Sequence, residues 1–270
     1  MSELLNAVRE AANGAFDGVS DAVILAMGVV GGLLVVVSVF ALLVSIYLSL
    51  CYMRYNRKKN TCGKTGEEIA RTILDEFGLQ KIKVSKSGSI LFGNSYSHYF
   101  KKVRLRRLTW RKKSVSSLAM AAQKSALAVL DSENDADMRK RVRLTPVIYL
   151  GPLAFVPMVI IGVVLDLLVF AGSGAAYTVI FSCIGLAVYL VSFVMSLLVL
   201  KTEKKAQRRA YEIMKKDGLA TDGELEMCKK LFRLYNIEYV NDMITALLEL
   251  IYRVLQIIAY VQNSSSSSEA

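Results

Sequence analysis

The sequence predicts a mainly α-helical, polytopic membrane protein with about four transmembrane helices and a small α+β domain on the cytoplasmic side. The chain is 54% hydrophobic, yet it carries 34 Lys and Arg residues against 23 Asp and Glu residues. Apolar and charged residues are separated into long runs, which is typical of membrane proteins. The polar stretches together exceed about a hundred residues, enough for one modest hydrophobic core.

Three apolar runs reach the roughly 20 residues that a transmembrane helix needs. Residues 22–53 contain no charge, and residues 147–200 contain two further runs, joined at Gly172, Ser173 and Gly174, with Asp166 as their only charge. A fourth run, 243–261, includes Glu249 and Arg253, which share one helical face because they are four residues apart. We expect it to span the membrane while packed against other helices; an amphipathic helix lying in the interface is the alternative.

The distribution of basic residues predicts the orientation of these spans. Basic clusters follow the first span, precede the second and follow the third, whereas residues 1–21 are acidic. The N-terminus is therefore expected outside the cell, with residues 54–146 and 201–242 in the cytoplasm and residues 262–270 as a Ser-rich tail. The first apolar run is too long for a signal-peptide core and is expected to be an anchor.

Local signals predict the elements of the polar stretches. Thr65 and Glu68 form a capping box for a helix that ends at Gly78. Residues 79–84 and 89–92 are predicted to form a hairpin, with a third strand at 102–106. Ser114 is expected to cap a helix with a stripe of mostly small apolar residues. Two more helices are predicted, over 204–216 and from a second capping box formed by Thr221 and Glu224.

Several motifs resemble those of the YugP-type bacterial membrane zinc metallopeptidases. Residues 114–122, SVSSLAMAA, are similar to the SIAAxAVAA that precedes HEVGHA in that family. Residues 63–71, GKTGEEIAR, look like its GxTGxEVAR, and residues 94–97 and 101–105 fall where it has DHYD and KxVRL. Residues 200–210 are similar to LPVEFDASRRA and retain Glu203, which matches the third metal ligand of the family.

The residues that would carry out zinc chemistry are replaced in this chain. At the expected HExxH motif, Gln123, Lys124 and Leu127 occupy the positions of the first histidine, the glutamate and the second histidine. A catalytic zinc site needs about three protein ligands and a general base. His98 is the only histidine, and no two of the four cysteines form a CxxC pair. We therefore predict no catalytic metal and no other cofactor, and we interpret His98 as a surface loop residue.

The strongest positive signal is a basic segment. Residues 77–130 contain twelve Lys and Arg residues and no Asp or Glu. Such a surface is attracted to anionic lipid, so an anionic membrane surface is the favoured partner, ahead of an acidic protein, with nucleic acid last because no stacking motif accompanies it. The residues expected to bind a polyanion are Lys101, Lys102, Arg104, Arg106, Arg107, Arg111, Lys112 and Lys113.

These observations predict a catalytically inactive metallopeptidase homologue in the bacterial inner membrane that serves as an anchored binding or scaffold protein. Its partner would be another protein, including a membrane protein or a second copy of this chain. One alternative is an active peptidase or other hydrolase with a non-standard site, for which the serines at 114, 116, 117 and 125 and Lys124 are the available groups. A second alternative is a protein that binds a membrane surface or nucleic acid through the basic segment. A transporter has only the charges within the apolar runs in its favour.

Overall fold

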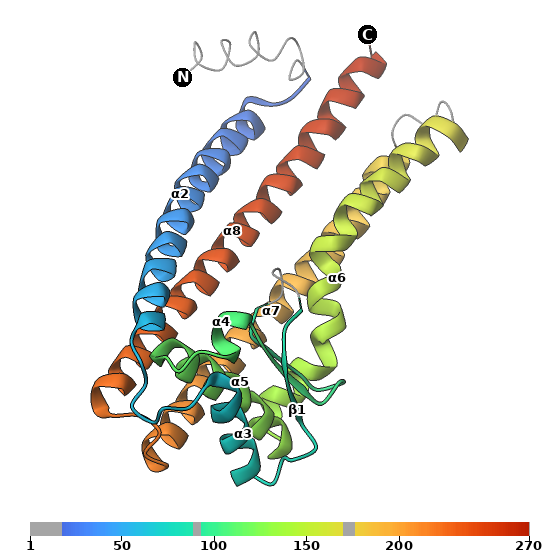
Figure 1. The fold of residues 1–270 in the computed structure, drawn as a ribbon. Coiled ribbons are helices and arrows are strands. Elements are labelled where there is room, and N and C mark those ends of the chain that lie inside the picture. The colour runs from blue at the N-terminus through green and yellow to red at the C-terminus, as the bar shows by residue number, and fades with distance from the viewer. Residues whose placement is uncertain (1–17, 89–92, 170–175, 270) are drawn as a thin grey trace. The chain divides into compact units, whose positions relative to one another are not determined.

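The computed structural model of the chain describes residues 18–88, 93–169 and 176–269. Most of the acidic N-terminal segment, the predicted strand at 89–92 and the connection at 172–174 lie outside these residues. The chain divides into two compact units. The membrane unit contains Met1–Ala41, Thr145–Ser196 and Asn241–Ala270, and the sheet unit contains Leu42–Leu144 and Leu197–Val240. Figure 1 shows the elements of both units along the chain.

The long helices are α2 (Asp21–Arg57), α6 (Ala136–Val164), α7 (Ala176–Lys216) and α8 (Asp222–Glu269). Three helical segments are long and apolar enough to cross a membrane, namely Asp21–Arg57, Tyr177–Lys216 and Asp222–Asn263. They contain the first, third and fourth predicted spans. In the second predicted span, the described residues include only a shorter apolar helix, Leu153–Leu168. Length and composition thus support three membrane-spanning helices among the residues that the structure describes.

The helix predicted at 204–216 and the one predicted to start near Thr221 are not separate elements. The first is the end of α7, which continues from an apolar segment without a break. The second is the beginning of α8, which continues into an apolar segment. No Gly or Pro lies between Leu200 and Lys204 to interrupt α7. Gly218, with φ of +61°, ends this helix region, and at the start of α8 the Glu224 carboxylate accepts hydrogen bonds from Thr221 N and Oγ1, which is one half of the predicted capping box.

Asp166 caps the start of α7. It lies in a π-helical turn, η1 (Leu165–Val169), which follows α6. Its Oδ1 accepts a hydrogen bond from Tyr177 N at 3.1 Å, and its Oδ2 accepts from Thr178 N at 2.7 Å and Thr178 Oγ1 at 2.6 Å. A carboxylate at a helix N-terminus satisfies free N–H groups and complements the helix dipole. This explains the one charge in residues 147–200.

Helices α6 and α7 pack closely because glycines lie between them. A Cβ atom on Gly162 would lie 2.6 Å from Thr178 Cα, and one on Gly185 would lie 3.3 Å from Phe155 Cα. Small residues allow such close backbone approach in membrane proteins. At one end of the membrane unit, the Ser20 N–H donates a hydrogen bond to Gln262 Oε1 at 3.0 Å, which joins the start of α2 to α8.

Among the described residues the sheet has three strands, β1 (Lys83–Lys86), β2 (Ser95–Ser97) and β3 (Lys102–Leu105), in the order β1-β3-β2. The predicted strand at 102–106 is confirmed as β3, whereas the strand predicted at 79–84 is found at 83–86 and its predicted hairpin partner lies outside the described residues. β1 pairs with β3 in parallel, and β2 pairs with β3 antiparallel. Val103 and Leu105 are fully buried, so β3 takes the central position and the more polar strands lie at the two edges. Edge strands tolerate polar residues best.

The core of the sheet unit is built around α5 (Val115–Ser132). The predicted cap is confirmed, since Ser114 Oγ accepts a hydrogen bond from Ser117 N. More of α5 is buried than the predicted apolar stripe. Every residue from Val115 to Leu130 is buried except Lys124, so all faces of the helix are covered. Helix α3 (Gly66–Glu76), with the Thr65–Glu68 capping box as predicted, and the short α4 (Arg107–Trp110) pack against α5.

Candidate functional site

Three of the four residues at the predicted motif positions, Gln123, Lys124 and Glu203, meet inside the sheet unit. Helix α5 carries Gln123 and Lys124, and Leu127 lies about one turn further along it. Glu203 comes from α7, beyond the apolar stretch of that helix, which ends at Leu200. Its side chain is 15% exposed. The tertiary structure therefore brings a largely buried carboxylate to the polar side chains of α5.

Both oxygens of the Glu203 carboxylate are bound by donors from other helices. Gln123 Nε2 donates to Oε2 at 2.8 Å, and Lys124 Nζ lies 2.9 Å from the same oxygen. Arg141 Nη2, on α6, lies 2.9 Å from Oε1. These four residues form what we call the Glu203 cluster. It joins α5, α6 and α7 through one carboxylate.

Thr202 extends the cluster on the α6 side. Arg141 Nη1 donates to Thr202 Oγ1 at 2.9 Å, so the guanidinium uses two nitrogens on two adjacent residues of α7. Such paired hydrogen bonds fix the orientation of an arginine more strictly than one bond would. No local sequence signal pointed to Arg141 at this site, because it lies 62 residues from Glu203 and resembled an ordinary basic flank of a membrane span.

The electrostatics of the cluster favour the ionised carboxylate. Burial alone would raise the pKa of Glu203, but the charges of Lys124 and Arg141 and their hydrogen bonds outweigh this and lower the pKa to about 2. At neutral pH the cluster therefore contains one negative and two positive charges. The surplus positive charge at the centre opposes the entry of another cation.

The residues of the cluster do not fit a zinc ion. Leu127 is 2% exposed and belongs to the hydrophobic core, so the position of the second expected histidine supplies apolar contact instead of a nitrogen. Lys124, at the position of the general base, is an ion-pair donor. Among the residues that the structure describes, no group of three or more His, Cys, Asp or Glu side chains could hold a metal ion. Glu203 alone offers a ligand, and its two oxygens are already bound.

A second set of ion pairs joins the region before and within α6 to α7. Arg209, Lys205 and Lys201 follow one another at intervals of four residues on α7. They pair with Glu133, with Asp135 and Asp137, and with Asp137, respectively. Burial alone would raise the pKa of Asp135, but its bonds, first that from Lys205, lower it. This row continues the connection between α6 and α7 that the Glu203 cluster begins.

His98 lies in a turn after β2 with its side chain 37% exposed, which agrees with the predicted surface loop residue, but it also contacts an acidic side chain. Its Nδ1 lies 2.7 Å from Asp131 Oδ2, which also accepts a hydrogen bond from Tyr96 Oη at 2.6 Å. Burial alone would raise the pKa of Asp131, but the bonds from Tyr96 and His98 outweigh it and the pKa lies below its ordinary value. Sequence reasoning missed this contact, because Asp131 ends α5 and His98 follows β2.

The serines considered for a hydrolase do not form a nucleophilic pair with Lys124. Ser114 Oγ donates to Asn56 Oδ1 at 3.0 Å and caps α5. Ser125 is fully buried, and its Oγ has no hydrogen-bond partner. The ammonium group of Lys124 binds Glu203 instead. A lysine that activates a serine must be a hydrogen-bond partner of that serine, whereas the hydrogen bond of Lys124 goes to a carboxylate.

The expected polyanion-binding residues lie just before, on and after β3. Lys101, Arg106, Arg107, Arg111, Lys112 and Lys113 are exposed, and Lys102 and Arg104 are half-buried. The Arg104 guanidinium lies 5.5 Å from the centre of the Phe100 ring. In addition, Phe100 and Leu108 are 70% and 52% exposed, so apolar side chains accompany the charges. We call this set of eight basic residues the basic surface.

Comparison with known proteins agrees with the motifs. Residues 31–258 match the family described as "Putative neutral zinc metallopeptidase". The chain is 24% identical over 210 residues to the "Putative membrane protease YugP" of Bacillus subtilis (strain 168), and the alignment covers 76% of this chain and 85% of that protein. No solved structure matches the chain. The family match over residues 31–258 includes α5 and the part of α7 that carries Glu203.

Proposed function

The chain belongs to the neutral zinc metallopeptidase family, and from this membership we propose that it is a catalytically inactive member that works as a membrane-anchored binding or scaffold protein. The observation that carries the proposal is the Glu203 cluster. The carboxylate at the position of a metal ligand is bound by an ammonium group, a guanidinium group and an amide. Three protein donors thus bind the carboxylate that would coordinate a metal in an active member of the family.

The cluster explains how an inactive member of the family would keep the fold of an active one. Removal of a metal from a buried site leaves its carboxylate without a positive charge, which is costly. Lys124 and Arg141 supply that charge, and Leu127 fills the remaining space with core contacts. The three helices α5, α6 and α7 remain connected without a metal. The unit is then available to present its surface to a partner.

We further propose that the sheet unit faces the cytoplasm and that the N-terminus lies outside. The excess of basic residues in the polar stretches supports this orientation. The basic surface would then meet the anionic leaflet or an acidic segment of a protein partner. Nucleic acid remains the least favoured partner of this surface.

The proposal is tested by measuring metal content and proteolysis on the purified full chain. We expect much less than one zinc per chain after dialysis against micromolar zinc, and no cleavage of casein or of a membrane-protein substrate. A variant with Gln123→His, Lys124→Glu and Leu127→His is expected to bind zinc weakly and to remain without appreciable activity, because Arg141 still binds Glu203. Stoichiometric zinc and proteolysis in the unmodified chain would overturn the proposal.

Zinc affinities of a set of variants show whether Arg141 prevents zinc binding. Adding Arg141→Leu to the triple variant removes the remaining cation from Glu203 and should raise zinc affinity over the triple variant alone. Lys201→Leu in the same background is the matched control, since Lys201 lies on α7 but pairs with Asp137. Equal zinc affinity in all three backgrounds would mean that the ion pair does not exclude the metal.

A further inference from the structure

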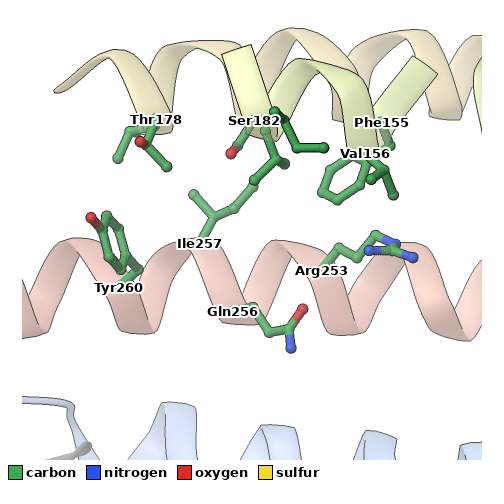
Figure 2. A pocket seen from close by; sticks show the side chains of 11 residues that line it. Phe155, Val156, Thr178, Ser182, Arg253, Gln256, Ile257 and Tyr260 are labelled. Atoms are coloured by element: carbon green, nitrogen blue, oxygen red, sulfur yellow. The ribbon is translucent and has the colours of Figure 1, made fainter. Parts of the chain in front are cut away.

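Grooves in the two units differ in the chemistry of their linings. In the membrane unit, residues of α6, α7 and α8 form a groove with a mostly apolar lining (Figure 2). Its one charged residue is Arg253, whose guanidinium carbon lies 4.4 Å from the centre of the Phe155 ring, one helical turn from Glu249. This charge already has an aromatic and an acidic neighbour. The sheet unit contains a groove whose charges are less well matched.

The groove of the sheet unit lies between the end of α7 and the beginning of α8, and we call it the α7–α8 groove. Its volume is about 450 Å³, within the range of roughly 300–1,000 Å³ that is common for ligand sites. Gln207 and Asn236 join the two helices, because each side-chain amide donates to the other, at 3.0 Å and 2.8 Å. Phe232, which is 5% exposed, and Tyr211 add aromatic surface. The groove therefore has a partly apolar floor on two connected helices.

Basic residues surround this floor, and the lining includes no acidic residue. They are Lys204 and Arg208 on α7 and Lys229 and Arg233 on α8, and all four are exposed. Lys229 lies 3.6 Å from a carboxylate oxygen of Glu226. Within the part of the chain that the structure describes, no ion pair within 4.0 Å joins a carboxylate to the other three. The groove thus has an excess of positive charge.

A second row of basic residues on α7 shows that this excess is particular to the groove. The row of Lys201, Lys205 and Arg209 is paired with acidic residues before and within α6. Lys204 and Arg208 come one position earlier than Lys205 and Arg209, which turns them by about 100° around the helix. One face of α7 therefore has its acidic partners within the chain, whereas the face at the groove has none among the described residues. Charges of this kind are available to a partner of opposite charge.

The position of the groove along the helices favours a protein partner over a lipid headgroup. The apolar stretch of α7 ends at Leu200, so Lys204 and Arg208 lie about 6 Å and about 12 Å beyond it at 1.5 Å per residue. Arg233 precedes the apolar run at 243–261 by about 15 Å on the same measure. The headgroup layer on each side of a bilayer is only roughly 5–8 Å thick. Of these three residues, Lys204 alone lies at the level of the headgroups.

We propose that the α7–α8 groove binds an acidic amphipathic helix of a partner protein. A groove between two neighbouring helices accepts the apolar face of a third helix, here against Phe232 and Tyr211. Asp or Glu residues beside that face then meet the basic residues of the rim, and guanidinium groups such as that of Arg208 match carboxylates with two parallel hydrogen bonds. The proposal rests on the proposed function, because it identifies the kind of partner that an anchored binding protein would hold.

The test measures peptide binding to the full chain in phosphatidylcholine nanodiscs by fluorescence anisotropy, with empty nanodiscs as the blank. Two labelled helical peptides share one leucine stripe, and they carry either Glu or Gln on both sides of it. The Glu peptide should bind at least about ten times more tightly at about 0.1 M salt, because several ion pairs act together. Arg208→Gln combined with Arg233→Gln should reduce this preference to less than about threefold.

Two further variants show whether the groove itself is responsible. Arg139→Gln combined with Arg143→Gln is the matched control, since these arginines are exposed on α6 and do not line the groove. This control should keep the preference of the unmodified chain. Arg208→Glu combined with Arg233→Glu should instead prefer a third peptide that has Lys in place of Glu, a result that a misfolded variant would not give.

Equal affinity for the Glu and Gln peptides would overturn the proposal, as would an unchanged preference after Arg208→Gln combined with Arg233→Gln. Native mass spectrometry tests the lipid alternative. If the unmodified chain retained phosphatidylglycerol over phosphatidylcholine and this variant did not, the groove would be a lipid site and the proposal would be wrong. Peptide and lipid binding are measured without reference to zinc content or proteolysis, so this proposal and the proposed function can fail separately.

Discussion

At the scale of single residues, the balance of charge around Glu203 governs the stability of the sheet unit. Removing the carboxylate by Glu203→Ala leaves Lys124 and Arg141 facing each other in a largely buried place. Breaking a buried pair in this way costs about 3–5 kcal/mol. The triple change Lys124→Met, Arg141→Met and Glu203→Met removes all three charges and should cost less than Glu203→Ala alone. Thermal unfolding in detergent measures the difference.

Lys201→Met provides a control for this prediction, because Lys201 is 64% exposed in its ion pair and should change stability by less than about 1 kcal/mol. The pH dependence gives a second readout. The pKa of Glu203 is lowered to about 2 from an ordinary value of 4.5, so its contribution is complete above pH 4.5 and is lost as the pH falls toward 2. A triple variant less stable than Glu203→Ala would contradict the charge argument.

Asp217 is expected to lower stability at neutral pH. Burial, together with the hydrogen bond and negative charge of Glu76, raises the pKa of Asp217 to about 6 from 3.8. The folded state therefore favours the protonated acid, and this contribution is lost as the pH rises from about 4 through 6. Asp217→Asn keeps a hydrogen-bond donor without a charge. It should raise the melting temperature at pH 7.5 and have little effect at pH 4.

Asp222→Asn is the control, since Asp222 is exposed at the start of α8. It should not reproduce the gain at pH 7.5. A stabilisation by Asp217→Asn that is equal at both pH values would show that the raised pKa of Asp217 is not its cause.

At the scale of elements, the contact between α6 and α7 depends on a missing side chain. Gly162→Ala places a Cβ atom 2.6 Å from Thr178 Cα and 2.8 Å from the Tyr177 carbonyl oxygen. Backbone atoms cannot move aside as a flexible side chain would, so the two helices must separate. Overpacking of this kind typically costs about 1–3 kcal/mol. Thermal unfolding in detergent should show the loss.

Gly28→Ala on α2 is matched to this change, because a Cβ at Gly28 has nothing within 4 Å. Alanine is also the better helix former, so this variant should be neutral or slightly stabilising in the same assay. Equal destabilisation by both substitutions would mean that the close packing of α6 on α7 is not the reason.

At the scale of the whole molecule, the basic surface should attach the protein to anionic membranes by electrostatics. Full chain held in neutral nanodiscs should bind phosphatidylserine vesicles at 0.1 M salt and largely release them at 1 M, because the Debye length falls from about 10 Å to about 3 Å. Changing six residues of the basic surface to Gln should weaken binding by several kcal/mol if each contributes about 1 kcal/mol. The six are Arg104, Arg106, Arg107, Arg111, Lys112 and Lys113.

The matched control changes six exposed basic residues elsewhere in the sheet unit to Gln, so that the total charge falls equally. These residues are Lys204, Arg208, Lys215, Lys229, Lys230 and Arg233. A smaller loss of binding is expected for the control. Equal binding to neutral and anionic vesicles, or tighter binding to RNA at the same salt concentration, would assign the basic surface to another partner.

The sequence by itself determined the features that depend on neighbouring residues. The capping box at Thr65, the cap at Ser114 and the signal formed by Thr221 and Glu224 place helix starts correctly, because a cap is made within one turn. Three of the predicted spans were found because apolar length is a local property. The identities of Gln123, Lys124 and Leu127 at the positions predicted for the zinc motif could also be read from the sequence, since they need no coordinates.

Only the tertiary structure decided the features that join distant parts of the chain. The pairing of β1 with β3 was not predicted, because strand pairing depends on which residues the core can bury, here Val103 and Leu105. Arg141 reached Glu203, and Asp131 reached His98, across intervals that no periodicity records. The role assigned to Glu203 changed as a result. In the sequence it resembled a leftover metal ligand, whereas in the folded protein it is the anion that holds α5, α6 and α7 together, because a buried carboxylate is stable only where cations and donors converge on it.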